Sequence, residues 1–236
     1  MKRLLLLSTL LLNTIVYGGL KKPLTMSSVG IGFSVGLSSM NTQAFNVYTP
    51  KQMPKFKQSQ ILIGAEGFGS FKRCIIGFSA NLAKGDKMQN DTYAYSLSGG
   101  SLSFNWAYKI NTQAQWLVFP MISAGVSAYG IGIDRKITPN QSEMVTYSNR
   151  SLNIRNAGVT TDISMNIFRL CPASTQKHNN KQHQPALGLK LGYTYGFKNS
   201  SWTYTGGSVT EGPKFGVRMV YLKLIIGGIS HTSIKL

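Results

Sequence analysis

The clearest pattern in the chain is a strict alternation of apolar and polar residues over 187–198, LGLKLGYTYGFK. Leucine, tyrosine and phenylalanine occupy the odd positions, and glycine, lysine and threonine occupy the even ones. A period of two predicts a β-strand, because successive side chains point to opposite faces of the pleat. An apolar face that ends in aromatics, opposite a face of small and cationic residues, is typical of a strand between lipid and a narrow lumen.

Other segments carry the same patterning and are predicted strands. They span about 26–38, 59–69, 73–84, 92–109, 115–132, 152–169 and 214–230. Within 92–109 the apolar positions change phase at Gly99 and Gly100, which predicts a β-bulge. Together with 187–198 these segments predict an all-β fold, a closed antiparallel transmembrane β-barrel of eight strands, with ten strands as the alternative.

The connections between the predicted strands alternate in kind. Those at 39–58, 85–91, 133–151 and 199–213 are long or polar, whereas 70–72 and 110–114 are tight. Short periplasmic turns and longer outer loops are typical of an outer-membrane barrel. The segment 170–185 is a long connection where a short one is expected.

The first residues resemble an export signal. Lys2 and Arg3 precede an apolar run from Leu4 to Val16 that is short for a membrane span, and cleavage after Gly18 is plausible. We therefore expect a signal peptide over 1–18 and a barrel domain over 19–236, with an N-terminal anchor helix as the alternative. No later stretch approaches the roughly 20 apolar residues of a spanning helix. These features predict a location in the cell outer membrane.

Composition supports a membrane barrel and argues against nucleic acid. Only 14% of residues are charged, 11% are aromatic and 25 are glycine, while the formal net charge is +18. The basic residues are scattered, whereas nucleic-acid-binding proteins cluster them. We expect the positive charge to face outer-membrane lipid and phosphorylated lipopolysaccharide.

The last fifty residues resemble a known family. Three runs of sequence are similar to small outer-membrane β-barrel proteins of the Bacteroidota. Two lie in the last fifty residues, LGLKLGYTYGFKNSSWTY followed by EGPKFGVRMVYLKLIIGGI, and the third, WLVFPMISAGVSAYGIGI, lies in the middle of the chain. The resemblance implies a porin-like barrel inserted by the barrel assembly machinery, and it carries no catalytic signature. This chain departs from the family at its end, GGISHTSIKL, where an aromatic or Gly-Phe terminus is common.

Four charged residues fall on faces predicted to line the lumen. They are Glu66, Asp162, Lys190 and Arg218. A lysine or arginine at the lipid midplane costs about 2–4 kcal/mol, so we expect these charges to pair inside the barrel, with Lys190 next to Glu66 or Asp162. The interpretation is a network of ion pairs that fills an eight-stranded interior, and the alternative is a gated conduction path.

The predicted loops carry aromatic and basic residues that suit recognition of glycans, phosphates or proteins, or anchoring at the lipid interface. The candidates are Lys55, Lys57, Arg135, Lys136, Trp202 and Tyr204.

Signals for chemistry are weak. His231, Thr232 and Ser233 would need an orienting acid to act as a lipid-modifying enzyme. His178 and His183 lack partners at metal-ligand spacing. Cys74 and Cys171 fall near the same rim but on strands that are not neighbours, which argues against a disulfide.

We therefore expect no cofactor, no metal and no catalytic residue. The predicted molecule is a monomeric barrel with a structural or surface-recognition role. The alternatives are a small anion-biased pore, a lipid-modifying enzyme, and a soluble lipocalin-like barrel with its apolar faces inward.

Overall fold

The computed structural model describes most of the chain from Ser28 to Thr232. The described residues are 28–47, 49, 55–90, 93–110, 115–135, 151–171, 181–198, 201–204, 206–209 and 214–232. The predicted signal peptide over 1–18 lies outside them. The barrel strands are β1 (Ser28–Met40), β2 (Ser59–Phe71), β3 (Cys74–Gln89), β4 (Tyr93–Tyr108), β5 (Trp116–Arg135), β6 (Ser151–Leu170), β7 (Lys181–Gly196) and β10 (Arg218–Thr232). A short helix α2 (Gln43–Asn46) and a small hairpin of β8 (Trp202–Tyr204) and β9 (Gly207–Val209) complete the elements.

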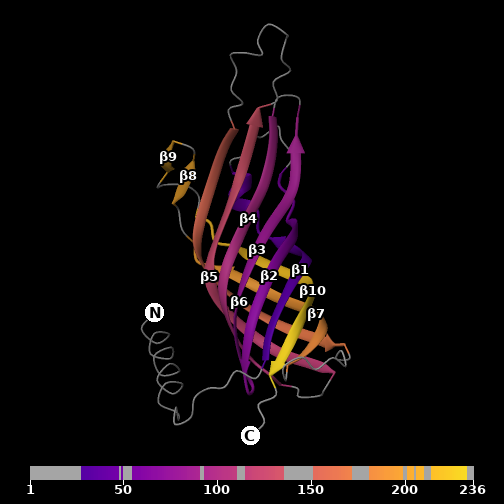
Figure 1. Ribbon diagram of the computed structural model, residues 1–236. Helices are drawn as coiled ribbons and strands as arrows, with labels where there is room; N and C mark the ends of the chain where they lie inside the picture. The colour runs from indigo at the N-terminus through magenta and orange to yellow at the C-terminus, as the bar shows by residue number, and fades with distance from the viewer. Residues whose placement is uncertain are drawn as a thin grey trace, which may run out of the picture.

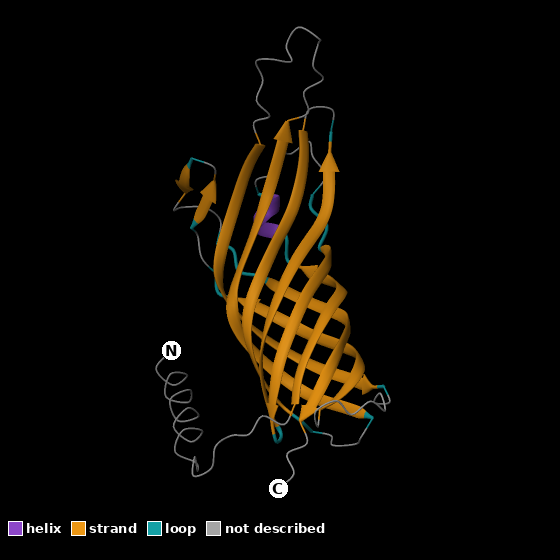
Figure 2. Cartoon of the chain, viewed as in Figure 1, coloured by secondary structure: helices purple, strands orange, loops and turns teal. Residues whose placement is uncertain are grey.

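These strands form a closed antiparallel barrel of eight strands, as predicted. Each strand from β1 to β6 pairs with the next in the chain, β7 pairs with β10, and β10 pairs with β1 to complete the circle (Figures 1 and 2). The ladder from β1 to β10 runs without a break from Ser28–His231 to Met40–Met219. The barrel therefore has no open edge within the wall.

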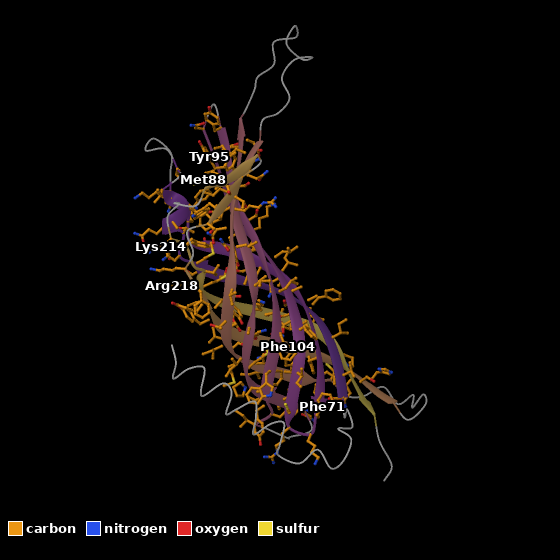
Figure 3. All side chains as sticks on the ribbon, turned by 90° about the vertical axis from the view of Figure 1, so that its left-hand side faces the viewer. Phe71, Met88, Tyr95, Phe104, Lys214 and Arg218 are labelled. Carbon is orange, nitrogen blue, oxygen red and sulfur yellow. The ribbon has the colours of Figure 1, made fainter. Side chains whose placement is uncertain are left out.

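The two ends of the barrel differ. One end, here called the inner end, carries the start of β1, the end of β10 and the tight turn between β2 and β3. Lys72 in that turn adopts a left-handed conformation with φ of 55°, which a two-residue hairpin turn requires. The opposite, outer end carries α2 and the β8–β9 hairpin, and Figure 3 places Tyr95 and Met88 near it and Phe71 near the inner end.

Four strands extend beyond the closed wall at the outer end. β3, β4, β5 and β6 rise past the other strands side by side (Figure 1). β7 pairs with β6 only from Thr160 inward, so the outer part of β6 is free to pair with β8 at Ile154–Tyr204 and Arg155–Thr203. The hairpin lies within 199–213, which we predicted to be a loop throughout.

The wall alternates as the sequence predicts. Outward positions carry large apolar side chains that are exposed, such as Phe33 at 71% and Leu82 at 69%, whereas inward positions are largely buried. The expected bulge at Gly99 and Gly100 is wrong, because both residues pair continuously with β3 and β5. The register shift lies instead on β3, between Lys84 and Lys87.

The physical reason for the missing bulge is an apolar interior at the outer end. Tyr95 and Leu97 are inward and buried there, so the apolar residues change face although the strand keeps its phase. Gly99 is needed at its position, because a Cβ would lie 2.2 Å from the ring of Tyr129 on the neighbouring strand. The strand bounds also differ: β3 continues to Gln89 through the predicted loop 85–91, and β7 begins at Lys181 rather than 187.

Candidate functional site

The lumen is filled in three layers along the barrel axis. A polar layer at mid-height lies between an apolar layer at the outer end and another at the inner end. The polar layer is lined by Ser79, Asn81, Ser101, Ser103, Ser123, Thr160, Asp162, Lys190, Thr194, Tyr221 and Lys223. This arrangement keeps polar groups away from lipid and lets them pair with one another.

Glu66 is the centre of the charge pairing in the polar layer. Lys190 Nζ donates a hydrogen bond to each carboxylate oxygen of Glu66, at 3.0 and 3.1 Å. Lys223 Nζ lies 3.9 Å from Glu66 Oε1 and donates a hydrogen bond to the side-chain oxygen of Asn81. The side chains of both lysines are 3% exposed, so their charges are balanced within the wall rather than by water.

Asp162 is held by hydroxyl groups instead of a cation. Tyr221 Oη donates to Asp162 Oδ1 and Thr194 Oγ1 donates to Asp162 Oδ2, both at 2.9 Å. Gly192 makes room for this arrangement, because a Cβ there would lie 2.4 Å from Tyr221 Oη. The lysine at position 190 therefore pairs with Glu66, the first of the two partners that we expected.

Arg218 does not lie in the lumen, contrary to our expectation. Its side chain is exposed on the outward face, with its guanidinium carbon 5.7 Å from the centre of the Tyr195 ring. Lys223 takes the inward place that Arg218 was expected to fill. The signal was present in the sequence, because a lysine at mid-strand should face inward and Lys223 shares the parity of Tyr221 rather than of Arg218.

The outer apolar layer closes the mouth with aromatic side chains from the connections. Phe45 of α2, Trp202 of β8 and Phe215 pack together, with ring centres 4.5–6.0 Å apart. Trp202 is 1% exposed, so our expectation that it lies on a loop for recognition or anchoring is wrong. Trp202 instead belongs to the buried apolar cluster at the barrel mouth, because the chain after β7 folds back over that mouth.

The inner apolar layer closes the other end. The stacked rings of Phe119 and Phe168, 5.7 Å apart, pack with Ile75, Met121 and Ile229 among others. Beside this layer, Lys109 in the turn after β4 donates to Ser70 Oγ at 2.9 Å. Burial lowers the pKa of the Lys109 ammonium from its ordinary value.

Little free space remains inside. Water can enter about 30 Å³ within the polar layer and about 20 Å³ within the inner apolar layer. A buried water needs roughly 10–15 Å³ of such space, so each cavity has room for isolated water molecules at most. In the described part of the chain the lumen is a packed core and contains no continuous channel.

The outer rim is basic. Its exposed cations in the described residues are Lys55, Lys57, Lys84, Lys87, Arg155, Lys198, Lys214 and Arg218. Lys57 pairs with Asp86 at 3.2 Å, and Tyr204 is 41% exposed on β8. Arg135 ends β5, and Lys136 lies outside the described residues. Lys55, Lys57 and Tyr204 are therefore available at the outer surface, in contrast to Trp202.

The other chemical candidates do not assemble a site in the described residues. There, no three His, Cys, Asp or Glu side chains gather where they could bind a metal ion. His183 lies on β7 and His231 on β10, whereas His178 and Ser233 lie outside the described residues. Both cysteines are free: Cys74 begins β3 and is half-buried, and Cys171 follows β6 and is exposed.

An apolar belt surrounds the wall, while the charges at mid-height, Glu66, Asp162, Lys190 and Lys223, face the lumen. Only lipid can cover such a belt on a closed barrel. The chain is an outer-membrane β-barrel protein. Aromatic and cationic pairs mark both borders of the belt, with Arg218 over Tyr195 towards the outer end and Arg169 over Trp116, 5.9 Å away, towards the inner end. No helix in the described residues is long and apolar enough to cross a membrane.

Comparisons with known proteins show similarity in fold. No family model matches the chain, and no curated protein matches it. The attachment invasion locus protein Ail of Yersinia pestis is 8% identical with a TM-score of 0.46, covering 87% of this chain and 99% of that one. Neisserial surface protein A is 9% identical with a TM-score of 0.39, covering 87% and 97%. The outer membrane protein OprG of Pseudomonas aeruginosa is 11% identical with a TM-score of 0.37, covering 88% and 97%.

Proposed function

We propose that this protein is a sealed, non-catalytic barrel that presents a basic outer surface for recognition of anionic glycans or phosphates. The observation that carries the proposal is the closed lumen: charges balanced at mid-height, with apolar layers above and below. A barrel filled in this way offers solutes no path through the membrane. We therefore assign its interactions with other molecules to the outer surface.

The charge of the rim supports the class of ligand. Exposed lysines and arginines outnumber the exposed acids Asp86 and Asp134 among the described residues at the outer end. Cations favour phosphate and sulfate groups, and Tyr204 adds an exposed ring on which a sugar could stack. The protein acts as a monomer, inserted by the barrel assembly machinery, and it belongs with the Bacteroidota barrels that its sequence resembles.

The test measures binding of proteoliposomes that carry the refolded protein to an immobilised sulfated or phosphorylated glycan. Replacing Lys55 and Lys57 by glutamine should weaken binding several-fold. The matched control replaces Lys72 and Arg73, two exposed cations at the inner end, by glutamine. Equal loss in both variants would mean non-specific attraction and would overturn the proposal, as would wild-type binding no stronger than that of empty liposomes.

A further inference from the structure

The lipid-facing wall contains a groove that spans β1 to β6. It has a volume of about 590 Å³ and an almost entirely apolar lining. One ladder row forms its length, in which neighbours pair directly across the strands: Ile63, Leu82, Gly100, Ala128 and Ala157. The positions at Gly100, Ala128 and Ala157 are small or bare, so the wall is hollowed along this row.

Larger side chains border this hollow. The next row towards the inner end contains Leu102 and Val126, which are 62% and 55% exposed and stand out from the wall. Leu82, at 69%, stands out from the groove row itself and separates its small positions from Ile63 on β2. The groove therefore has the size of a small-ligand site and the chemistry of a hydrocarbon chain.

The next row towards the outer end is charged. Lys84, Ser98, Gly130 and Arg155 pair in that order across β3 to β6, directly beside the groove row. Lys84, Ser98 and Arg155 are exposed. Three strand spacings separate the two cations, which is about 14 Å. Arg155 Cγ lies 2.8 Å from the place of a Cβ on Gly130, so its aliphatic stem crosses over that glycine.

We propose that the groove and this row bind one glycolipid that carries two phosphate groups on a head of about two sugar rings. Its acyl chain occupies the groove between Leu82 and Val126. Lys84 and Arg155 each bind one phosphate, and the head lies over the hydroxyl of Ser98 and the bare backbone of Gly130. Lys84 and Arg155 belong to the basic outer rim, and the inference adds to it a lipid site in the wall. The variants at Lys55 and Lys57 test the rest of the rim separately, because neither residue lines the groove.

Charge selects this occupant over a second copy of the chain. The groove alone would suit another barrel, but copies related by a two-fold axis along the membrane normal hold their cations at the same height. Lys84 and Arg155 of the two copies would then repel one another in an environment of low dielectric constant. No acid of the described residues forms an ion pair with either cation, so an anion from outside the chain can take that place.

Native mass spectrometry of the refolded protein tests the proposal with bisphosphorylated lipid A, its monophosphorylated form, a phosphate-free form and inorganic phosphate. We expect binding to fall in that order, with no retained inorganic phosphate. Replacing Lys84 and Arg155 by glutamine should weaken binding of the bisphosphorylated lipid by about tenfold to a hundredfold. The matched control, Lys214→Gln with Arg218→Gln, removes the same charge around the start of β10, which does not line the groove, and should leave binding unchanged.

A second pair of variants tests the groove itself. Ala128→Leu fills it and should reduce lipid binding, whereas Val220→Leu changes an outward residue of β10, a strand that does not line the groove, and should not. The proposal would be overturned if the wild-type protein and the Lys84 and Arg155 double variant bound all three lipids equally. The lipid at the groove would then be ordinary surrounding lipid, held without recognition of its phosphates. A dimer that Ala128→Leu disrupts without affecting lipid binding would assign the groove to a second copy instead.

Discussion

Replacing Glu66 by glutamine should be the most damaging conservative change in the lumen. The substitution keeps the shape and removes the only carboxylate within 4.0 Å of the two buried lysines in the described residues. Lys190 would lose its anionic partner and one of the two acceptors that lie 3.0 and 3.1 Å away, because an amide nitrogen donates, and Lys223 would lose an attraction at 3.9 Å. Breaking a buried ion pair from one side destabilises a protein by about 3–5 kcal/mol, because the remaining charge stays buried. We expect the upper part of that range, since two charges lose their partner.

The assay is equilibrium unfolding by urea of protein refolded into lipid vesicles, followed by tryptophan fluorescence and by heat-dependent mobility on gels. Lys190→Met is the comparison and should cost less, because Glu66 keeps Lys223 nearby. The double variant, Glu66→Gln with Lys190→Met, should destabilise by less than the sum of the single changes, which measures their coupling. A loss below about 1 kcal/mol for Glu66→Gln, the value of a solvent-exposed pair, would refute the buried network.

Further predictions concern the ends and the outer face of the barrel. Trp202→Ala should destabilise by about 3–5 kcal/mol because it empties the centre of the outer apolar layer, and unchanged urea unfolding would contradict that role. Arg218→Gln should change stability by at most about 1 kcal/mol, since the guanidinium is exposed. A loss as large as that of Glu66→Gln would show that Arg218 faces the lumen after all. Lys109 has a lower pKa in the folded protein than its ordinary 10.5, so the unfolded chain binds its proton more tightly and stability should rise as pH climbs towards 10.5; Lys109→Met should flatten that rise. Cys171 should react with a maleimide in the folded protein without prior reduction, and a requirement for reductant would show a disulfide.

The wall of the barrel could be predicted from the sequence because the surroundings of each strand impose its alternation. Lipid on one side and a narrow lumen on the other force apolar and small or polar residues to alternate, and Leu187 to Gly196 follow that rule without exception. The pairing of Lys190 with Glu66 followed from the same rule, because a charge in mid-strand has nowhere favourable except the lumen.

The outer end could not be predicted by the same rule, because the interior there is apolar. Tyr95 and Leu97 face inward and Trp202 folds over the mouth, so an apolar residue no longer marks the lipid side. The apparent phase change at Gly99 and Gly100 and the assignment of Trp202 to a surface both followed from that assumption. Arg218 was misplaced for a related reason: it lies at the border of the belt, where a cation can reach the headgroups.

The groove beside Lys84 and Arg155 was also beyond the sequence alone. Its residues come from six strands, and only the register shows that Gly100, Ala128 and Ala157 are neighbours. Residues that are neighbours in this row, such as Gly100 and Ala128, lie on different strands and are far apart in the chain. A slip of two residues in one strand would separate the cations from the groove while preserving the alternation.

The central claim is that the lumen is sealed, and single-channel recording in planar bilayers tests it most directly. Purified, refolded protein should insert without producing stable unitary current steps, at either polarity and in high salt, because the polar layer is closed by the layers around Trp202 and Phe168. A variant that lacks aromatic side chains at Phe45, Trp202 and Phe215 should remain silent as well, since the inner apolar layer persists. Reproducible unitary conductance from the wild-type protein, biased towards anions, would contradict the account and identify the barrel as a pore.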